Sequence, residues 1–204
     1  MKDTWFKLPE DKRDRIIQAA FIAFARTGYE KTSLDAIVKA AGISKGGLYE
    51  YIDAKEDLFR FVLEEAYRRL GSRIKERTGE MPADPLERTV HIAEIAVDFY
   101  MEQAACIAFI VRSSRLEQEL MQEDAQSVFD RYFLDLYGDA DYSQIICGRD
   151  RLLLLLKWLL VKTRNDFLDS RVSGVEATEC RRRYLEEWGF FLSVLKTGVY
   201  VQKK

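Results

Sequence analysis

The chain has 204 residues, of which 48% are hydrophobic and 32% are charged, and its formal net charge is −2. This length and composition are sufficient for one medium domain or two small ones, and they exclude a disordered chain. The near-neutral charge argues against a protein that coats nucleic acid. Prolines and glycines are few, and no long stretch alternates apolar with polar residues as a half-buried strand does. We therefore predict an all-α fold.

The first two predicted helices are separated by a short turn. Residues 9–26 have an apolar face at helical spacing, and Gly28 follows just beyond their end. A second helix begins after Thr32 or Ser33, either of which can act as its N-cap, and stops at Gly42. This helix is barely two turns long, so it needs neighbours to hold it.

The third predicted helix starts on unusually bare backbone. With Ser44 as N-cap, its first three positions are Lys45, Gly46 and Gly47. Two glycines weaken a helix by roughly 1 kcal/mol each relative to alanine. However, the N–H groups of a first turn point outward without intrahelical partners, and glycine lets a phosphate or base edge approach them closely. The bare start of this helix therefore indicates a docking surface.

A long fourth helix is predicted from after Asp53 to about Arg77, with Asp53 and Glu56 at the spacing of a capping box. Residues 79–85 form the clearest linker in the chain. Beyond it, helical spacing predicts five more helices, at about residues 85–103, 105–114, 116–137, 149–169 and 176–199, which gives about nine in all.

The segment TSLDAIVKAAGISKGGLYEYIDAKEDLF, residues 32–59, has the layout of a helix-turn-helix DNA-binding motif. It closely resembles the signature of the tetracycline-repressor (TetR) family of bacterial transcription regulators. The resemblance is detailed over about residues 10–60, and elsewhere it extends only to length and helical character. It implies a DNA-binding head over residues 1–55, a linking helix over about 54–77, and a ligand-binding and dimerisation body over residues 56–204.

The resemblance also implies which residues contact DNA. Thr32 or Ser33 would cap the second helix and donate to a phosphate, the start of the third helix would enter the major groove, and Lys55 would bind a phosphate. Core packing is the alternative for the two tyrosines of the third helix, but they cannot share one face, so at least one ring should be exposed. The full predicted set is Thr32, Ser33, Ser44, Lys45, Gly46, Gly47, Leu48, Tyr49, Tyr51 and Lys55.

The segment departs from the family at Gly47, Glu50 and Ile52, where Thr, His and Phe are often found. Without the Thr hydroxyl, direct reading of bases by this helix is expected to be sparse. Glu50 either accepts a hydrogen bond from a cytosine amino group or turns away from the phosphates. Ile52 is expected to change core packing only.

The remaining helices carry apolar residues that have two interpretations. Aromatic residues on the middle helices either pack in a core or, as in the TetR family, line a pocket for an apolar or aromatic effector; these are Phe99, Tyr100, Phe109, Phe129 and Phe133. The last two helices are apolar nearly all round, so a second copy of the chain is expected to cover one face, unless all of it is internal core. The predicted dimer contacts are Leu156, Trp158, Leu160, Tyr184, Trp188, Phe191, Leu192 and Leu195.

Other kinds of site are not expected. His91 is the single histidine and no cysteine lies at ligand spacing from it, which argues against a metal site, and nothing in the sequence calls for a cofactor. Cys106, Cys147 and Cys180 are odd in number and far apart, as in reduced cytoplasmic thiols. Neither a membrane span nor a signal peptide is apparent, so a cytoplasmic protein without membrane association is predicted. No P-loop, dinucleotide-binding glycine pattern or nucleophile elbow supports an enzyme.

The sequence therefore predicts a homodimeric, sequence-specific transcription regulator. It is expected to be a repressor that a small-molecule ligand releases from a palindromic DNA operator. The alternative is a DNA-binding factor that acts without a ligand, in an architectural role or by binding other proteins.

Overall fold

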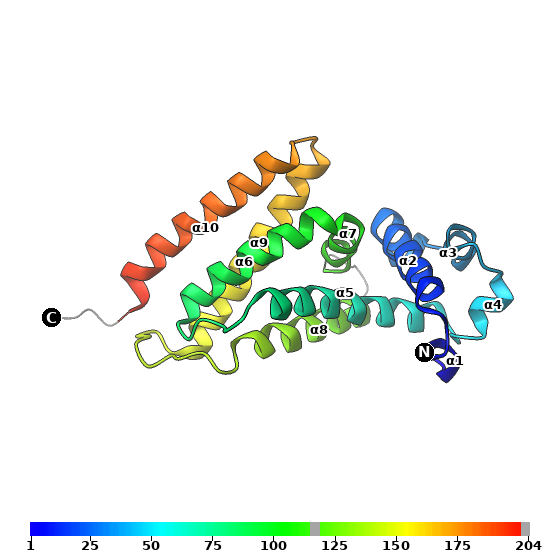
Figure 1. Cartoon of the computed structure of the whole chain (residues 1–204), viewed down its shortest axis with the longest axis horizontal. Helices are drawn as coiled ribbons and strands as arrows, with labels where there is room; N and C mark the ends of the chain where they lie inside the picture. The colour runs from blue at the N-terminus through cyan, green and yellow to red at the C-terminus, as the bar shows by residue number, and fades with distance from the viewer. Residues whose placement is uncertain (115–118, 201–204) are drawn as a thin grey trace. The chain divides into compact units, whose positions relative to one another are not determined.

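The structure is a computed structural model that describes residues 1–114 and 119–200 of the chain. Its regular elements within these ranges are helices, in agreement with the predicted all-α fold (Figure 1). In chain order they are α1 (Asp3–Phe6), α2 (Glu10–Lys31), α3 (Leu34–Ala41), α4 (Lys45–Tyr49), α5 (Lys55–Arg77), α6 (Pro85–Glu102), α7 (Ala104–Ser113), α8 (Glu119–Tyr137), α9 (Arg149–Val172) and α10 (Ala177–Val199).

The predicted helices from residue 34 onward match the structure to within a few residues, although the predicted start at residue 116 lies outside the described ranges. At Gly28 the backbone leaves the helical conformation (φ 76°, ψ 169°), as the predicted end of the first helix requires, and a short helical segment then continues to Lys31, so α2 is kinked there. One local prediction needs correction. The carboxylate that reaches back at the start of α5 belongs to Asp57 rather than Glu56, because Asp57 accepts from the N–H groups of Asp53 and Ala54 at 3.0 and 2.9 Å. These two bonds, with Ala54 the stronger, hold the pKa of Asp57 below its usual range.

The chain divides into two compact units. Unit 1 contains residues 1–69, 103–114 and 119–130, that is α1 to α4, the first part of α5, α7 and the first part of α8. Its core is an aromatic cluster in which α2, α5 and α7 meet. Phe59 of α5 lies 5.2 Å from Phe24 of α2 and 5.5 Å from Phe109 of α7, between ring centroids, and Phe21 lies 5.4 Å from Phe109. This cluster fixes α2, on which α3 packs.

Unit 2 contains residues 70–102 and 131–200, with α6, α9 and α10 as its main helices. α10 lies against both α6 and α9. Tyr100, Phe167 and Tyr184, one from each of these helices, meet with ring centroids 5.7 to 6.1 Å apart. Arg88 of α6 is buried, and it donates to the carbonyls of Pro82 and Leu136 and to Asp139. Its guanidinium therefore ties the linker before α6 to the end of α8.

The predicted boundary between head and body, at residues 55 and 56, falls in the first turn of α5, which contributes to both units. That boundary stays a prediction. Among the described helices, none is both long and apolar enough to cross a membrane.

Candidate nucleic-acid interface

The start of α3 is fixed by two adjacent hydroxyl side chains with different tasks. Ser33 is the N-cap, and its Oγ accepts from the N–H of Ala36 at 3.2 Å. Thr32 is buried and closes the end of α2, where its Oγ1 lies 2.6 Å from the carbonyl of Gly28 and 2.7 Å from Oγ1 of Thr27. Of the two predicted caps, Ser33 is therefore the actual one. The Thr32 hydroxyl is engaged inside unit 1 and is not presented to a phosphate.

The turn between α3 and α4 follows the sequence prediction. Gly42 takes a left-handed backbone (φ 67°, ψ 37°) as the C-cap of α3, a conformation that glycine adopts without steric cost. The N–H of Ile43 then donates back to the carbonyl of Val38 at 3.0 Å, so the turn is short and internally bonded. This turn and α3 place the start of α4 on the surface of unit 1.

The first turn of α4 leaves its backbone available. Oγ of Ser44 accepts from the N–H of Gly47 at 3.0 Å, as predicted for an N-cap. The N–H groups of Lys45 and Gly46 have no partner among the described residues, and both residues are exposed. A Cβ placed on Gly46 would meet no atom within 4 Å. Nothing inside the molecule therefore requires glycine at position 46, and the two free donors are open to an acceptor from outside.

The Lys45 side chain points to α3, where its Nζ lies 3.0 Å from Oδ1 of Asp35 and 3.1 Å from Oδ2. The hydrogen bond to Asp35 raises the pKa of Lys45, so the ammonium charge is retained at neutral pH. Both side chains are exposed, and such pairs are weak in water. Lys45 can therefore exchange this partner for a phosphate.

The apolar residues of α4 and the turn after it separate into buried and exposed sets. Leu48 is fully buried, so its side chain does not reach a DNA groove and instead anchors α4 to the core. The two tyrosine rings face different ways, as predicted, because Tyr49 is 42% exposed and Tyr51 only 7%. The Tyr51 ring packs on Trp5, and its hydroxyl accepts from Nζ of Lys12 at 3.3 Å. Of Leu48, Tyr49 and Tyr51, only Tyr49 has a side chain exposed enough to contact another molecule. Glu50 beside it is exposed as well.

The Lys55 side chain is bonded inside unit 1 instead of pointing to a phosphate as predicted. Its Nζ donates to the carbonyls of Tyr29, Glu30 and Thr32 at 2.8, 3.3 and 3.2 Å. An ammonium group has three N–H donors, and here all three are used by backbone carbonyls at the end of α2. The prediction that Lys55 binds a phosphate is therefore not supported by this geometry, in which the side chain joins α5 to α2.

α1, which was not predicted from the sequence, supports the C-terminal end of α4. The Lys2 N–H donates to the carbonyl of Tyr51 at 2.8 Å, its Nζ donates to the carbonyl of Tyr49 at 2.9 Å, and Thr4 donates to the carbonyl of Glu50. These are carbonyls at the C-terminal end of α4, which have no partners within the helix. A four-residue helix has no periodicity to recognise, and the one available signal was the apolar pair Trp5 and Phe6 among charged residues.

The predicted pocket aromatics fall into both units. Phe109 lies in the aromatic core of unit 1, and Phe129 packs on Tyr67 with centroids 5.8 Å apart. Phe99, Tyr100 and Phe133 are buried in unit 2. Core packing accounts for the contacts of these residues within each unit, and their role in ligand binding stays a prediction.

The predicted dimer contacts also divide. Leu156, Tyr184 and Trp188 are buried inside unit 2, so they are unavailable to a second copy in this structure, and the prediction is wrong for them. Trp158 is 60% exposed, while Leu160, Phe191, Leu192 and Leu195 are partly exposed. α9 and α10 also expose large apolar side chains that were not among the predicted contacts, which are Leu154, Val172, Phe190 and Val194.

Known proteins share both the sequence of this region and the fold. Residues 16–62 match the model of the family described as bacterial regulatory proteins, tetR family. The HTH-type transcriptional regulator AcrR of Shigella flexneri is 33% identical over 92 residues, which cover 43% of this chain and 43% of that protein. The chain spans less than two thirds of the length of the curated relatives that it matches first.

Two solved structures show the same fold over nearly the whole chain. A TetR family transcriptional regulator from Chloroflexus aurantiacus has a TM-score of 0.68 at 18% identity, with 98% of this chain and 99% of that one covered. The regulator FadR from Bacillus subtilis, in complex with stearoyl-CoA, has a TM-score of 0.67 at 16% identity, with 86% and 96% covered. The predicted resemblance to the TetR family is therefore confirmed, in sequence over residues 16–62 and in fold over most of the chain.

Proposed function

We propose that this protein is a sequence-specific DNA-binding transcription regulator whose reading element is the start of α4. The observation that carries this proposal is the pair of free backbone donors at Lys45 and Gly46, on an exposed helix start that the Ser44 cap holds rigid. Hydrogen-bond donors at a helix N-terminus favour an anionic acceptor. The exposed Lys45 and Tyr49 side chains flank these donors and supply a charge and a hydroxyl.

Fewer residues are proposed to contact DNA than were predicted from the sequence. We propose Ser33, Ser44, Lys45, Gly46, Gly47 and Tyr49 as the contacting surface, with Leu48, Tyr51, Thr32 and Lys55 as the residues that hold it in place. The proposed head, residues 1–55, contains all of them. Most of these contacts are to backbone or phosphate, so this surface positions the protein more than it reads bases directly.

We propose further that the protein acts as a homodimer through α9 and α10. Leu154 and Trp158 lie one turn apart on α9, and Phe190 and Val194 lie one turn apart on α10, all more than half exposed. A twofold pair of copies would bury these apolar faces against each other and present two heads to a palindromic site. Curated relatives of the chain include proteins named as a negative regulator and as a repressor, which favours repression.

The control of this repressor by a ligand belongs to the same proposal. FadR, which shares the fold, is a regulator solved in complex with stearoyl-CoA. We propose that a small apolar or aromatic effector binds the body, residues 56–204, and favours a conformation with lower operator affinity. The test is release of operator DNA by added effector, with acyl-CoA thioesters and apolar aromatic compounds as the first probes.

Selection from a random duplex library, followed by sequencing, tests the DNA-binding function. We expect enrichment of a palindrome whose half-sites are separated by about one or more helical turns. A salt titration of the selected duplex should show affinity falling steeply with salt, as phosphate contacts require. Weak binding without an enriched sequence would overturn the proposal and favour an architectural DNA-binding factor.

A further inference from the structure

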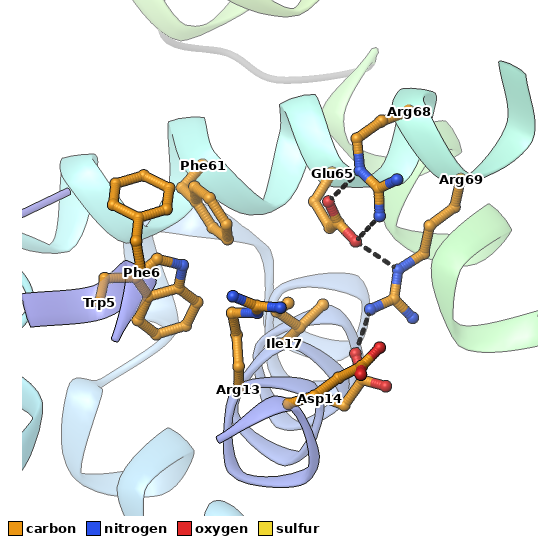
Figure 2. Close-up of a pocket in the computed structure, with 10 residues that line it drawn as sticks. Trp5, Phe6, Arg13, Asp14, Ile17, Phe61, Glu65, Arg68 and Arg69 are labelled. Atoms are coloured by element: carbon orange, nitrogen blue, oxygen red, sulfur yellow. Dashed lines mark hydrogen bonds and ion pairs between the residues drawn. The ribbon is translucent and has the colours of Figure 1, made fainter. Parts of the chain in front are cut away.

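A cavity of about 650 Å³ lies in unit 1 between α1, α2 and α5 (Figure 2). None of its lining residues belongs to the predicted DNA-binding or effector-binding sets. One wall is aromatic and is made by Trp5 and Phe6 of α1 with Phe61 of α5. The other wall is charged, with Arg13 and Asp14 from α2 and Glu65 from α5 among its residues. Its volume lies in the range of small-molecule sites, which runs from about 300 to 1,000 Å³.

Two of the carboxylates in the charged wall are already satisfied. Glu65 accepts from Nε of Arg68 at 2.7 Å and from Nε of Arg69 at 2.8 Å, while Asp14 accepts from Arg69 at 2.6 Å (Figure 2). Burial would raise the pKa of Glu65, but the hydrogen bonds from the two arginines outweigh it and lower that pKa. The third carboxylate, Glu10, is exposed in the first turn of α2, where a negative charge is favoured.

Besides the exposed Glu10 carboxylate, two groups among the lining residues are hydrogen-bond donors without a partner among the described residues. The half-buried guanidinium of Arg13 has no hydrogen bond or ion pair with any described residue. Nε1 of Trp5 is buried and also lacks an acceptor in the described part of the chain. Trp5 is fully buried, so its N–H is not open to the cavity, whereas Arg13 is partly exposed and its guanidinium is the donor that a bound acceptor could meet. Figure 2 shows Arg13 and the aromatic residues Trp5, Phe6 and Phe61 among the side chains that line this cavity.

We propose that this cavity binds a small aromatic carboxylate. Its carboxylate would accept paired hydrogen bonds from Arg13, a geometry that the planar guanidinium favours. Its ring would pack on the accessible part of the aromatic wall, which is formed by Phe6 and Phe61 and is backed by the buried Trp5. This site uses none of the aromatic residues predicted for the effector pocket, and the binding step does not depend on DNA recognition.

Ligand binding here has a direct consequence for α4. The residues of α1 that line the cavity stand next to Lys2 and Thr4, which bond the carbonyls of Tyr49, Glu50 and Tyr51. A helix of four residues is not stable by itself and depends on its contacts. A ligand that contacts the exposed Phe6 adds such a contact, so it should hold α1, and through it the end of α4, in the observed position.

The test is isothermal titration of the full chain with naphthoate and with naphthamide, its neutral counterpart. We expect naphthoate to bind, and naphthamide to bind at least about tenfold more weakly, because it lacks the charge that Arg13 would meet. Arg13→Gln should weaken naphthoate binding at least about tenfold. Arg13→Lys should bind more tightly than Arg13→Gln but more weakly than the wild type, because lysine keeps the positive charge and lacks the planar guanidinium that makes paired hydrogen bonds. Arg15→Gln is the matched control, since Arg15 is an exposed arginine on the same helix outside the cavity. Thermal melts would establish that all three variants are folded.

Hydrogen exchange of the free protein supplies the second readout. Naphthoate should slow exchange of the amides of residues 45–52 in the wild type and in Arg15→Gln, and leave Arg13→Gln unchanged. No binding of naphthoate at millimolar concentration, or equal binding by Arg13→Gln and Arg15→Gln, would overturn the proposal. If Arg13→Gln weakens binding of random duplex DNA while naphthoate does not bind, Arg13 serves a phosphate and the proposal is also overturned. Failure to select an operator would leave all of these binding results unaffected and would count against the proposed function alone.

Discussion

Nζ of Lys55 lies 2.8 Å from the carbonyl oxygen of Tyr29 and 4.3 Å from the centroid of its ring. One ammonium group therefore closes the end of α2 by hydrogen bonds and also packs on an aromatic face. The same group bonds the carbonyls of Glu30 and Thr32. Lys55 thus joins α2 to α5 at the point where the chain enters α3, so it helps to set the position of α3 and α4.

The first prediction concerns the stability that Lys55 provides. Lys55→Met should lower the free energy of unfolding by about 1–3 kcal/mol, because it leaves three carbonyls without a donor and removes a cation–π contact. Urea denaturation at fixed pH measures this change. Lys45→Met is the control, since its exposed ion pair with Asp35 contributes little and stability should hardly change. Unaltered stability in Lys55→Met, together with lost operator affinity, would restore a phosphate-binding role for Lys55.

The second prediction separates docking from folding at the two glycines of α4. Gly46→Ala meets open space and improves helix propensity, so unfolding should require equal or more denaturant. If a phosphate approaches the Gly46 N–H, the added methyl group should reduce operator affinity by about 10- to 100-fold, the worth of one charge-assisted hydrogen bond.

Gly47→Ala is the comparison for this test, because its Cβ would lie 3.0 Å from Oγ of Ser44. That contact disturbs the N-cap, so both stability and affinity should fall. Both quantities can be measured on the same preparations by denaturation and by fluorescence anisotropy with labelled operator. Full affinity in Gly46→Ala would show that nothing docks closely on this backbone.

The sequence predicted the local features of the head because they depend on near neighbours. Ser33, Gly42 and Ser44 cap α3 and α4 within three residues of the groups they satisfy, and such signals are readable from spacing. Lys55 was assigned to a phosphate because its true partners are carbonyls 23 to 26 residues earlier in the chain. Lys55 and these carbonyls come together only because α5 packs on α2, and this packing cannot be predicted from the periodicity of the sequence.

The same limit explains the partial success with the dimer contacts. α9 is apolar nearly all round, so the sequence indicated that two faces are covered but not which residues belong to each. The position of α6 decides this for unit 2, because Tyr184 packs on Tyr100 of that helix and is thereby buried. Trp158 remains exposed on α9. Which side chains of α9 and α10 are exposed is therefore decided by the tertiary packing and could not be predicted from the sequence.

The third prediction is a pH dependence that comes from Glu65. Its pKa in the folded protein lies below the ordinary value of 4.5, because the hydrogen bonds from Arg68 and Arg69 outweigh the opposing effect of burial. A lowered pKa means that the ionised form stabilises the fold above about pH 4.5, and that this contribution is lost as pH falls through the lowered value. The difference in unfolding free energy between wild type and Glu65→Gln should therefore be larger at pH 6 than at pH 3. Urea titrations at the two pH values measure it, and a difference that grows towards acid would contradict the assignment.

The fourth prediction tests the proposed dimer face at Trp158. Burying a large apolar side chain contributes about 1.5–3 kcal/mol, and a twofold axis uses each residue twice. Trp158→Arg should therefore raise the dimer dissociation constant by about a hundredfold or more and yield monomers at micromolar concentration in sedimentation velocity runs. Leu134→Arg is the control, because Leu134 is also exposed, at 47%, but lies on α8. A dimer that survives Trp158→Arg but dissociates in Leu134→Arg would move the interface from α9 and α10 to α8. Because a palindrome is read by two heads at once, the Trp158→Arg monomer should also bind a half-site about as well as the full operator, whereas the wild type should prefer the full operator.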